Sequence, residues 1–427
     1  ALIDGGGIIA RLGQLILIDS SYFGSNYASE NGGGILSRDS KFIRINDSYI
    51  VHNSAKFGGG VQIKRGLAEI RHLRLMKNVA FLNGGAFYLH FCKKAAMHKC
   101  SIRKNKALGL GGGVYSENTG KHVVFIAHFS GNEARSGGSL YISNFDKSIT
   151  SFSTFDQNVA HHKGGCFFFK TTIESLESRV LVNNASFTNN IAKGKGAVVY
   201  TDYVKTVFLN LLKISSKSKH NLGSSLINMH CTNLILNRLN LRNLIKHVTN
   251  VNLYFYSSAI IKDILFSCPN PSYLNELSFL QNFGKALQLS YKCDTCIKNT
   301  YILKPSSWFI NKEIRNLHKN PKPFECHACP LHAVCLQGEI VTEPNYWGYA
   351  ADKTVYIVEC PPEYCCQKSP CPSFSSCNIG REGKLCSKCK QNFTLSLSNR
   401  KCLSQNICAA HWFWFMFILN ILGYFLF

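Results

Sequence analysis

The stretch Phe23-Gly-Ser-Asn26-Tyr-Ala28-Ser-Glu-Asn-Gly32-Gly-Gly-Ile35 decides the fold, because its order of residue types returns along the first 200 residues. Each copy holds an apolar residue three positions before an asparagine, an alanine two positions after it, and a glycine pair that leads into an apolar residue, except that the last, worn copy has Gly196-Ala197 in place of the pair. The repeat asparagines lie 25 to 32 residues apart, at Asn26, Asn53, Asn78, Asn105, Asn132, Asn158 and Asn190. A nearly fixed period of this length predicts a stacked repeat architecture.

The content of each repeat indicates strands. Runs such as Ala86-Phe-Tyr-Leu89 and Cys166-Phe-Phe-Phe169 follow the glycine pairs, and β-branched or aromatic runs bounded by glycine are typical of strands. A helical repeat would need about 10–12 residues of helical periodicity, which the repeats lack. A leucine-rich repeat is the main alternative, but its Leu-x-x-Leu-x-Leu pattern is absent. We therefore predict an all-β fold, a right-handed parallel β-helix with one coil per repeat.

The repeat also makes three geometric predictions. The apolar residue before each asparagine should point inward and stack on its counterpart in the next coil. Asparagine tolerates left-handed backbone geometry, so we expect the repeat asparagines to adopt it at a turn and to hydrogen-bond one another along the solenoid. The glycine pair supplies the positive φ that a sharp bend requires.

Phe-x-x-Asn followed by Gly-Gly-Ala/Gly-Ile/Val resembles the repeat of chlamydial polymorphic outer-membrane autotransporters. It is also similar to the pectin-lyase-like β-helix of large ciliate surface proteins. The resemblance covers residues 1–200 and implies the β-helix. It does not imply one function, because the same coil carries adhesins, lyases and structural spikes.

The chain has 48 Lys and Arg residues against 24 Asp and Glu residues, a formal net charge of +24. No run of five or more basic residues occurs, and scattered charge is typical of a solvated face. We therefore expect no nucleic-acid partner. The charge either serves solubility alone or forms a cationic surface that faces anionic glycans or lipid headgroups. The partners that we expect, besides the membrane, are anionic glycans or cell-surface proteins.

Cysteine usage changes abruptly along the chain. Four cysteines precede residue 268 and fifteen lie from Cys268 to Cys408, which predicts an oxidising compartment and a core cross-linked by disulfides. Zinc is the alternative, because Cys-x-x-Cys pairs begin at Cys293, Cys326 and Cys386, but their separations do not match a zinc ribbon. We assign disulfides, with open connectivity and without metal or other cofactor, to Cys268, Cys293, Cys296, Cys326, Cys329, Cys335, Cys360, Cys365, Cys366, Cys371, Cys377, Cys386, Cys389, Cys402 and Cys408.

The segments Cys326-His-Ala-Cys-Pro330 and Gly383-Lys-Leu-Cys-Ser-Lys-Cys389 resemble the cysteine-rich, EGF-like juxtamembrane module of ciliate and other protist multi-spanning surface proteins. In those proteins such segments precede the first membrane span. Here Trp412–Phe427 is almost wholly apolar, with Asn420 its clearly polar interruption. We predict the start of a transmembrane helix over 411–427, with a buried core helix as the alternative.

The predicted organisation has four regions. Residues 1–200 form regular coils, 201–267 degenerate closing coils, 268–408 the cysteine-rich EGF-like module, and 411–427 the start of a transmembrane helix that the sequence truncates. Because the chain starts inside a repeat and stops within the apolar stretch, we expect a fragment of a longer protein.

Catalysis on a β-helix needs clustered carboxylates, either to bind Ca²⁺ for lyase chemistry or as an acid/base pair for hydrolysis. The acids in the repeats are isolated in sequence, and His161-His162 lies in a loop, where a solvated turn is the simpler interpretation. We therefore assign no catalytic, cofactor-binding or metal-binding residue. A glycan-processing lyase or hydrolase remains the alternative function.

The combination predicts the extracellular stalk of a membrane-anchored surface protein that serves in adhesion or recognition. It would lie in the plasma membrane or another membrane of the secretory pathway, with its N-terminal region extracellular or lumenal. A second alternative is the ectodomain of a multi-pass sensor or channel-like protein. The candidate glycosylation sites are the sequons at Asn46, Asn184 and Asn392.

Overall fold

The computed structural model describes residues 3–172, 177–216, 225–244, 251–255, 258–268, 272–282, 286–303, 307–310, 326–351, 354–396, 400–405 and 410–426. The chain forms two compact units. The first, which we call the solenoid, comprises Ala1–Asn270, Leu274–Asp294 and Ser306–Pro323. The second, the cysteine-rich unit, comprises Pro271–Tyr273, Thr295–Pro305 and Phe324–Phe427.

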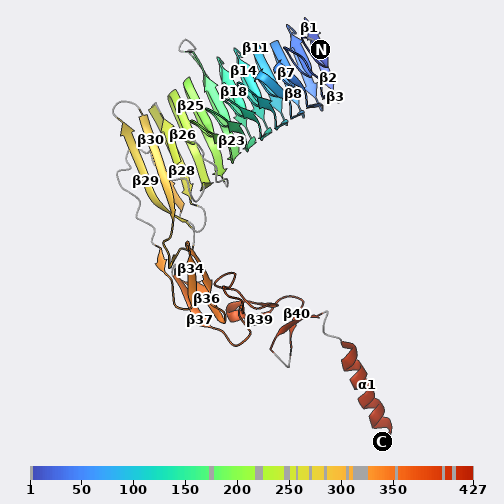
Figure 1. The fold of residues 1–427 in the computed structure, drawn as a ribbon, viewed down its shortest axis with the longest axis vertical. Coiled ribbons are helices and arrows are strands. Elements are labelled where there is room, and N and C mark those ends of the chain that lie inside the picture. Colours follow the sequence, from blue (N-terminus) through green and yellow to red (C-terminus); the bar gives the residue numbers. More distant parts are fainter. Residues whose placement is uncertain are drawn as a thin grey trace. The chain divides into compact units, whose positions relative to one another are not determined.

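The solenoid is a parallel β-helix, as predicted. Each coil pairs in parallel register with the next, so that Val61 lies opposite Phe87 and Phe87 opposite Val114. The strands form successive rungs from β1 to β28 (Figure 1). Each regular coil has four sides, which we number in chain order from the glycine pair.

Strands of the first side follow the glycine pairs. They are β1 (Ile8–Arg11), β4 (Ile35–Arg38), β14 (Val114–Glu117), β18 (Leu140–Ser143), β22 (Phe167–Lys170), β27 (Val251–Phe255) and the first parts of β8 (Val61–Arg71), β11 (Phe87–His98), β25 (Val199–Ser216) and β26 (Ile227–Leu244).

The second side comprises β2 (Leu15–Asp19), β5 (Phe42–Asn46), β15 (Lys121–Phe125), β19 (Lys147–Ser151), the last parts of β8 and β11, the first parts of β23 (Arg179–Thr188) and β28 (Ser258–Ser267), and the middle of β25 and β26.

The third side comprises β3 (Tyr22–Gly24), β6 (Tyr49–Val51), β9 (Arg74–Met76), β12 (Ser101–Arg103), β16 (His128–Ser130), β20 (Thr154–Asp156) and the last parts of β23, β25, β26 and β28. The fourth side is a separate sheet of β7 (Ser54–Phe57), β10 (Val79–Asn83), β13 (Lys106–Ala107), β17 (Glu133–Ala134), β21 (Val159–Ala160) and β24 (Ile191–Ala192).

Sharp bends join the fourth side to the first. The first glycine of each pair has φ between 56° and 75°, as the sequence predicts, at Gly5, Gly32, Gly58, Gly84, Gly111, Gly137, Gly164 and Gly196. The second glycine is required for a different reason, the close approach of the neighbouring coil. A Cβ on Gly59 would lie 2.4 Å from the Val79 carbonyl oxygen, so no side chain fits there.

The expectation that the repeat asparagines adopt left-handed geometry is wrong. The residue before each one has φ between 52° and 63° instead, at Ser25, His52, Lys77, Lys104, Gly131, Gln157 and Asn189. This placement puts the turn outside the core and directs the asparagine side chain inward. There the carboxamide forms hydrogen bonds with the neighbouring coils.

The asparagine side chains form a buried hydrogen-bond ladder. Asn132 Nδ2 donates to Asn158 Oδ1 at 2.9 Å and to the Ile102 carbonyl at 2.8 Å. Asn132 Oδ1 accepts from the backbone N–H of Asn105 at 3.1 Å and from Asn105 Nδ2 at 3.0 Å. The full hydrogen-bonding capacity of the carboxamide is therefore used between coils.

The apolar positions that precede the asparagines form the predicted inward stack. The phenyl rings of Phe129 and Phe155 stack with centroids 5.0 Å apart, and those of Phe155 and Phe187 with centroids 5.2 Å apart. Phe23, at the first coil, is partly buried. The fully buried members are Ile50, Leu75, Ile102, Phe129, Phe155 and Phe187.

One buried titratable group interrupts the apolar interior. His122 is buried on the second side, and its Nε2 lies 2.7 Å from Ser116 Oγ. Burial lowers the pKa of His122 from 6.5 to about 3, because an imidazolium would lose its hydration there. The native state therefore holds this imidazole neutral.

Parallel pairing continues beyond residue 200, where the glycine pairs end. β25 and β26 each run for 18 residues and pair with each other, and β26 pairs in parallel with β28. The end of the solenoid is antiparallel: β30 (Ala286–Thr295) pairs with β27 and β29 (Ser272–Asn282), and β32 (Ser307–Ile310) pairs with β28. The cysteine-rich region expected from residue 268 thus begins within the solenoid.

The cysteine-rich unit is built from short two-stranded sheets. These are β31 (Thr300–Tyr301) with β33 (His327–Ala328), β34 (Ala333–Leu336) with β35 (Glu339–Thr342), β36 (Tyr346–Ala351) with β37 (Thr354–Glu359), β38 (Arg381–Glu382) with β39 (Lys388–Cys389), and β40 (Phe393–Leu395) with β41 (Cys402–Ser404), plus the 3-10 turn η2 (Lys384–Cys386).

The apolar stretch at the C-terminal end forms helix α1 (Ala410–Leu426). Its described side chains, from Trp414 to Leu422, are exposed. Among the residues that the structure describes, no helix combines the length and the apolar character needed to cross a membrane.

Replacing Asn132 by Ala should destabilise the solenoid by at least about 3 kcal/mol, because the buried donors and acceptors of Asn105, Asn158 and Ile102 lose partners together. Urea unfolding measures the loss. The matched control is Asn26→Ala: Asn26 is half-buried at the ladder's end, where water can replace the side chain, so about 1 kcal/mol or less is expected. Equal costs for the two variants would contradict a cooperative ladder.

The neutral His122 predicts an acid-sensitive stability. Its folded-state pKa lies below the unfolded value of 6.5, so its contribution is complete above pH 6.5 and falls by about 1.4 kcal/mol per pH unit toward pH 3. Between pH 7 and pH 4.5, His122→Gln should therefore lose about 2–3 kcal/mol less unfolding free energy than the parent chain. Identical pH dependence in urea titrations would mean that the imidazole reaches solvent in the native state.

Candidate recognition surface

Several acidic side chains of the coils lie in ion pairs with basic side chains of neighbouring coils. Glu69 Oε2 lies 2.8 Å from Arg44, and Asp39 Oδ1 lies 2.7 Å from Arg65. Partial burial favours the neutral form of Glu69, but hydrogen bonds from Arg44 and Arg71 outweigh it and lower the pKa of that carboxyl. These acids serve to neutralise cations between neighbouring coils.

His161, in the loop that holds His161-His162, takes part in a further ion pair, with Glu133 of the preceding coil. Glu133 Oε1 lies 2.8 Å from His161 Nε2 and 3.1 Å from Lys106 Nζ. The hydrogen bond from His161, followed by that from Lys106, lowers the pKa of Glu133. Within the described ranges, no group of three His, Cys, Asp or Glu side chains is placed to hold a metal ion.

A column of buried aromatic rings runs along the first side. Tyr88, Tyr115, Tyr141, Phe168 and Tyr200 occupy equivalent positions of successive coils, with ring centroids 4.7 to 5.4 Å apart. All five are buried, because Phe57 and Leu110 also pack against them. Each ring face contacts the next ring, which stabilises the stack but leaves no open face for a ligand.

The hydroxyl groups of Tyr88, Tyr115 and Tyr141 stay protonated. Burial, and then the charge of Glu117, raises the pKa of Tyr88 and of Tyr141 to about 12, and that of Tyr115 is also raised. Tyr115 donates to Glu117 Oε2 at 3.0 Å. The aromatic column is therefore a structural feature of the first side.

The second side carries four stacked cations. Lys94 lies opposite Lys121, Lys121 opposite Lys147, and Lys147 opposite Arg179. All four side chains are exposed. We call them the cationic column. The cationic column was not predicted, because the sequence contains no run of basic residues. Aligning the repeats on their glycine pairs places Lys94, Lys121 and Lys147 at the same position, and this alignment is the signal that could have revealed the column.

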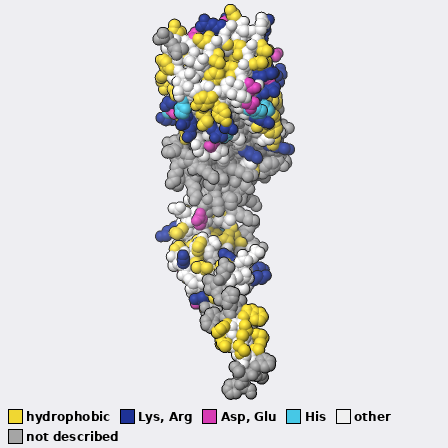
Figure 2. Space-filling model, turned by 90° about the vertical axis from the view of Figure 1, so that its right-hand side faces the viewer, with side chains coloured by type: hydrophobic (Ala, Val, Ile, Leu, Met, Phe, Trp, Pro, Cys, Tyr) yellow, Lys and Arg dark blue, Asp and Glu magenta, His cyan; other side chains and the backbone are white. Residues whose placement is uncertain are grey.

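Two further columns run beside the cationic column on the same side. The middle one is aliphatic and partly buried, with Ala96, Val123, Ile149 and Leu181 in register. The outer column ends at two asparagines, Asn183 and Asn210. There Asn210 Nδ2 donates a hydrogen bond to Asn183 Oδ1 at 2.9 Å. Figure 2 shows one face of the molecule, where Lys and Arg side chains border hydrophobic and uncharged ones and acids are few.

The cysteines form seven disulfides. Every Cys-x-x-Cys pair is divided between two of them, which is not the arrangement of a zinc ribbon. Cys408 lies outside the described residues. The pairs are Cys268–Cys293, Cys296–Cys326, Cys329–Cys335, Cys360–Cys365, Cys366–Cys371, Cys377–Cys386 and Cys389–Cys402.

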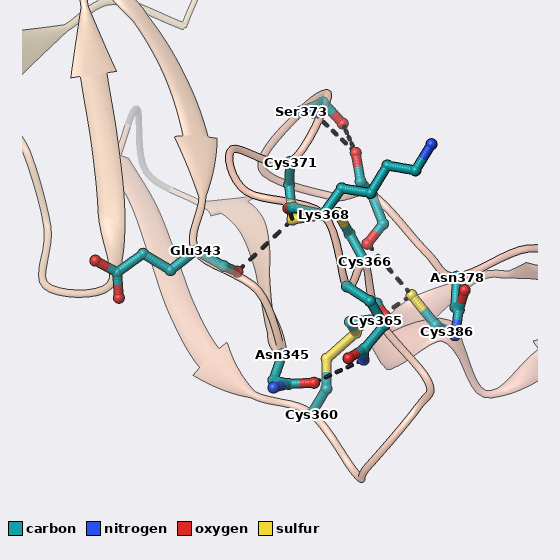
Figure 3. Close-up of a disulfide and its surroundings, with 12 residues drawn as sticks. Glu343, Asn345, Cys360, Cys365, Cys366, Lys368, Cys371, Ser373, Asn378 and Cys386 are labelled. Atoms are coloured by element: carbon teal, nitrogen blue, oxygen red, sulfur yellow. Dashed lines mark hydrogen bonds between the residues drawn. A yellow bond between two sulfur atoms is a disulfide. The ribbon is translucent and has the colours of Figure 1, made fainter.

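Two of these disulfides touch. The Sγ atoms of Cys365 and Cys386 lie 3.4 Å apart, so Cys360–Cys365 packs against Cys377–Cys386 (Figure 3). Trp347 and Tyr364 cover this cluster. Sulfur thus occupies the centre of a unit whose strands are too short to bury a large apolar core.

The sequons differ in accessibility. Asn184 is exposed at a corner of the solenoid with φ 47°, beside a hollow of ≈ 480 Å³ that Lys213 and Arg238 also line. Asn392 is exposed in the turn before β40. Asn46 is half-buried at the end of β5. Exposed turns at Asn184 and Asn392 are the more accessible to modification.

No family model matches the chain, and no solved structure matches it. Among curated proteins, the chain is similar to the Probable autotransporter YfaL of Escherichia coli (strain K12), with 29% identity over 158 residues. The match covers 33% of this chain and 13% of that protein. It agrees with the autotransporter-like repeat found in the sequence, whereas the ciliate, pectin-lyase and EGF-like resemblances stay predictions.

The disulfides predict a defined thiol count. The denatured, unreduced protein should react at no more than five of its nineteen cysteines, since seven disulfides occupy fourteen. Before denaturation Cys92, Cys100 and Cys166 should be protected, because burial raises the pKa of each thiol, to about 12 for Cys92 and about 11 for Cys100. Thiol titration measures both states; a larger count, or zinc released on denaturation, would contradict an oxidised module.

Proposed function

We propose that this chain is the extracellular stalk of a membrane-anchored surface protein, and that it acts in recognition or adhesion without catalysis. The observation that carries the proposal is the pairing of a regular β-solenoid with a unit held by disulfides. Disulfides persist in oxidising compartments outside the cytosol, which supports a location at the cell surface or in the secretory pathway.

The similarity to a protein named as a probable autotransporter supports the same location. A solenoid presents long, continuous sides on which equivalent residues of successive coils line up. Such sides suit recognition of extended partners better than they suit a closed catalytic site.

Membrane attachment is proposed at α1. The described part of the helix is apolar and exposed on all sides, with Asn420 bonded to the Met416 carbonyl within the helix. A helix that is apolar all round needs an apolar environment. The tryptophan at 414 suits an interfacial position at the start of such an anchor.

The ion pairs of the coils favour recognition over catalysis. A lyase or hydrolase needs carboxylates that stay available for Ca²⁺ or for proton transfer. Glu69, Asp39 and Glu133 are instead engaged with arginine, lysine or histidine side chains. The glycan-processing and multi-pass sensor alternatives have no comparable observation in their favour.

The test uses the full chain, secreted from a eukaryotic host and coated on beads. The beads are applied to cultured cells and to an array of neutral and acidic glycans, with beads carrying the reduced and alkylated chain as the control. We expect binding by the native chain alone, and no reducing or unsaturated sugar ends released over time. Sugar release would establish the enzyme instead, and the absence of binding to every surface would refute recognition.

A further inference from the structure

The cationic column places like charges next to one another on the second side of the solenoid. Neighbouring parallel strands lie about 4.8 Å apart, so Lys94, Lys121, Lys147 and Arg179 place four positive charges along roughly 14 Å. Like charges directly opposite each other on adjacent strands are destabilising. The fold nevertheless aligns them in strict register.

Acids do not neutralise this column in the part of the chain that the structure describes. Asp146 and Glu177 are close in sequence to Lys147 and Arg179, but neither forms an ion pair with a member of the column there. Two coils earlier on the same side, Arg44 is paired with Glu69 on the next coil. Arg44 thus has an acid in register with it on the next coil, whereas the residues in register with the ends of the cationic column are Leu67, beside Lys94, and Thr206, beside Arg179.

The neighbouring columns define what kind of anion fits. The partly buried aliphatic column of Ala96, Val123, Ile149 and Leu181 offers a flat apolar strip, which suits the C–H faces of sugar rings. The amides of Asn183 and Asn210 can exchange hydrogen bonds with hydroxyl groups. Charge, apolar strip and amides all run parallel to the solenoid axis.

We propose that the second side binds a linear polyanionic glycan, carboxylated or sulfated, lying along the solenoid axis with its acidic groups on the cationic column. This inference rests on the proposed recognition function and adds its ligand class. Single-stranded nucleic acid fits less well, because it is bound through open aromatic faces, and on this side the rings of His98 and Phe125 stack on each other with centroids 5.3 Å apart. An anionic membrane fits less well, because the side chains of the aliphatic strip are only partly exposed.

The experiment measures binding of the full chain to two probes, a heparin decasaccharide and a polygalacturonate decamer, with a neutral dextran of similar length as the control ligand. The test variant is Lys121→Gln/Lys147→Gln. The matched variant is Lys77→Gln/Lys104→Gln, which removes two exposed lysines from adjacent coils at another corner and leaves the same net charge.

We expect the parent chain to bind at least one acidic probe and not dextran, with affinity that falls as salt rises. Lys121→Gln/Lys147→Gln should weaken binding about tenfold or more, whereas Lys77→Gln/Lys104→Gln should stay within about twofold. Lys121→Arg/Lys147→Arg should retain binding, since it keeps the charges. The melting temperature of Lys121→Gln/Lys147→Gln should not fall, because repulsion within the column is relieved.

Three results would overturn the inference. Equal losses in the two glutamine variants would indicate a general effect of net charge. Stronger binding to single-stranded DNA or to phosphatidylserine vesicles, lost in Lys121→Gln/Lys147→Gln, would assign the column to another ligand. Binding of the beads to cells without binding to either acidic probe would leave the recognition function standing and remove the glycan from it.

Discussion

The hydrogen-bond ladder of the repeat asparagines fixes each coil on the next, and the rest of the solenoid depends on that register. Asn132 satisfies both donors and both acceptor positions of its carboxamide between coils. A slip by one residue would leave all of these groups buried without partners, at about 1–3 kcal/mol each. The neighbouring phenyl stack of Phe129 and Phe155 is nondirectional by comparison. Burial of the rings stabilises the solenoid, and the ladder selects its register.

The sequence allows the repeat-dependent part of this structure to be predicted. The intervals between Asn26 and Asn190 predict stacked coils, and the glycine pairs predict the bends at φ 56° to 75°. The other corners could not be predicted, because residues such as Phe91 and Ile126 occupy left-handed positions that their side chains disfavour. The parallel pairing of the flanking strands with the neighbouring coils holds them in place. Their conformation follows from the stacking of whole coils and leaves no local sequence signal.

The cationic column also could not be predicted from local sequence. Lys94, Lys121 and Lys147 lie 26 or 27 residues apart, so no local run of charge marks them. The disulfides were predictable as a class from cysteine density, but their pairing was not. Cys293 and Cys296 belong to one short motif, yet the first closes the solenoid with Cys268 and the second joins the cysteine-rich unit with Cys326. Pairing depends on where each unit ends, which spacing alone does not reveal.

Register also explains how a repulsive column can persist. Between Lys147 and Arg179 the chain is longer than between the preceding lysines, because more residues separate β22 from β23 than β18 from β19. Arg179 still lies opposite Lys147, and Phe187 still stacks on Phe155. The strands therefore keep their alignment despite the extra length. A ladder strong enough to hold this alignment can also hold like charges about 4.8 Å apart, so the repeated interior sets the spacing at which the outer surface displays its charges.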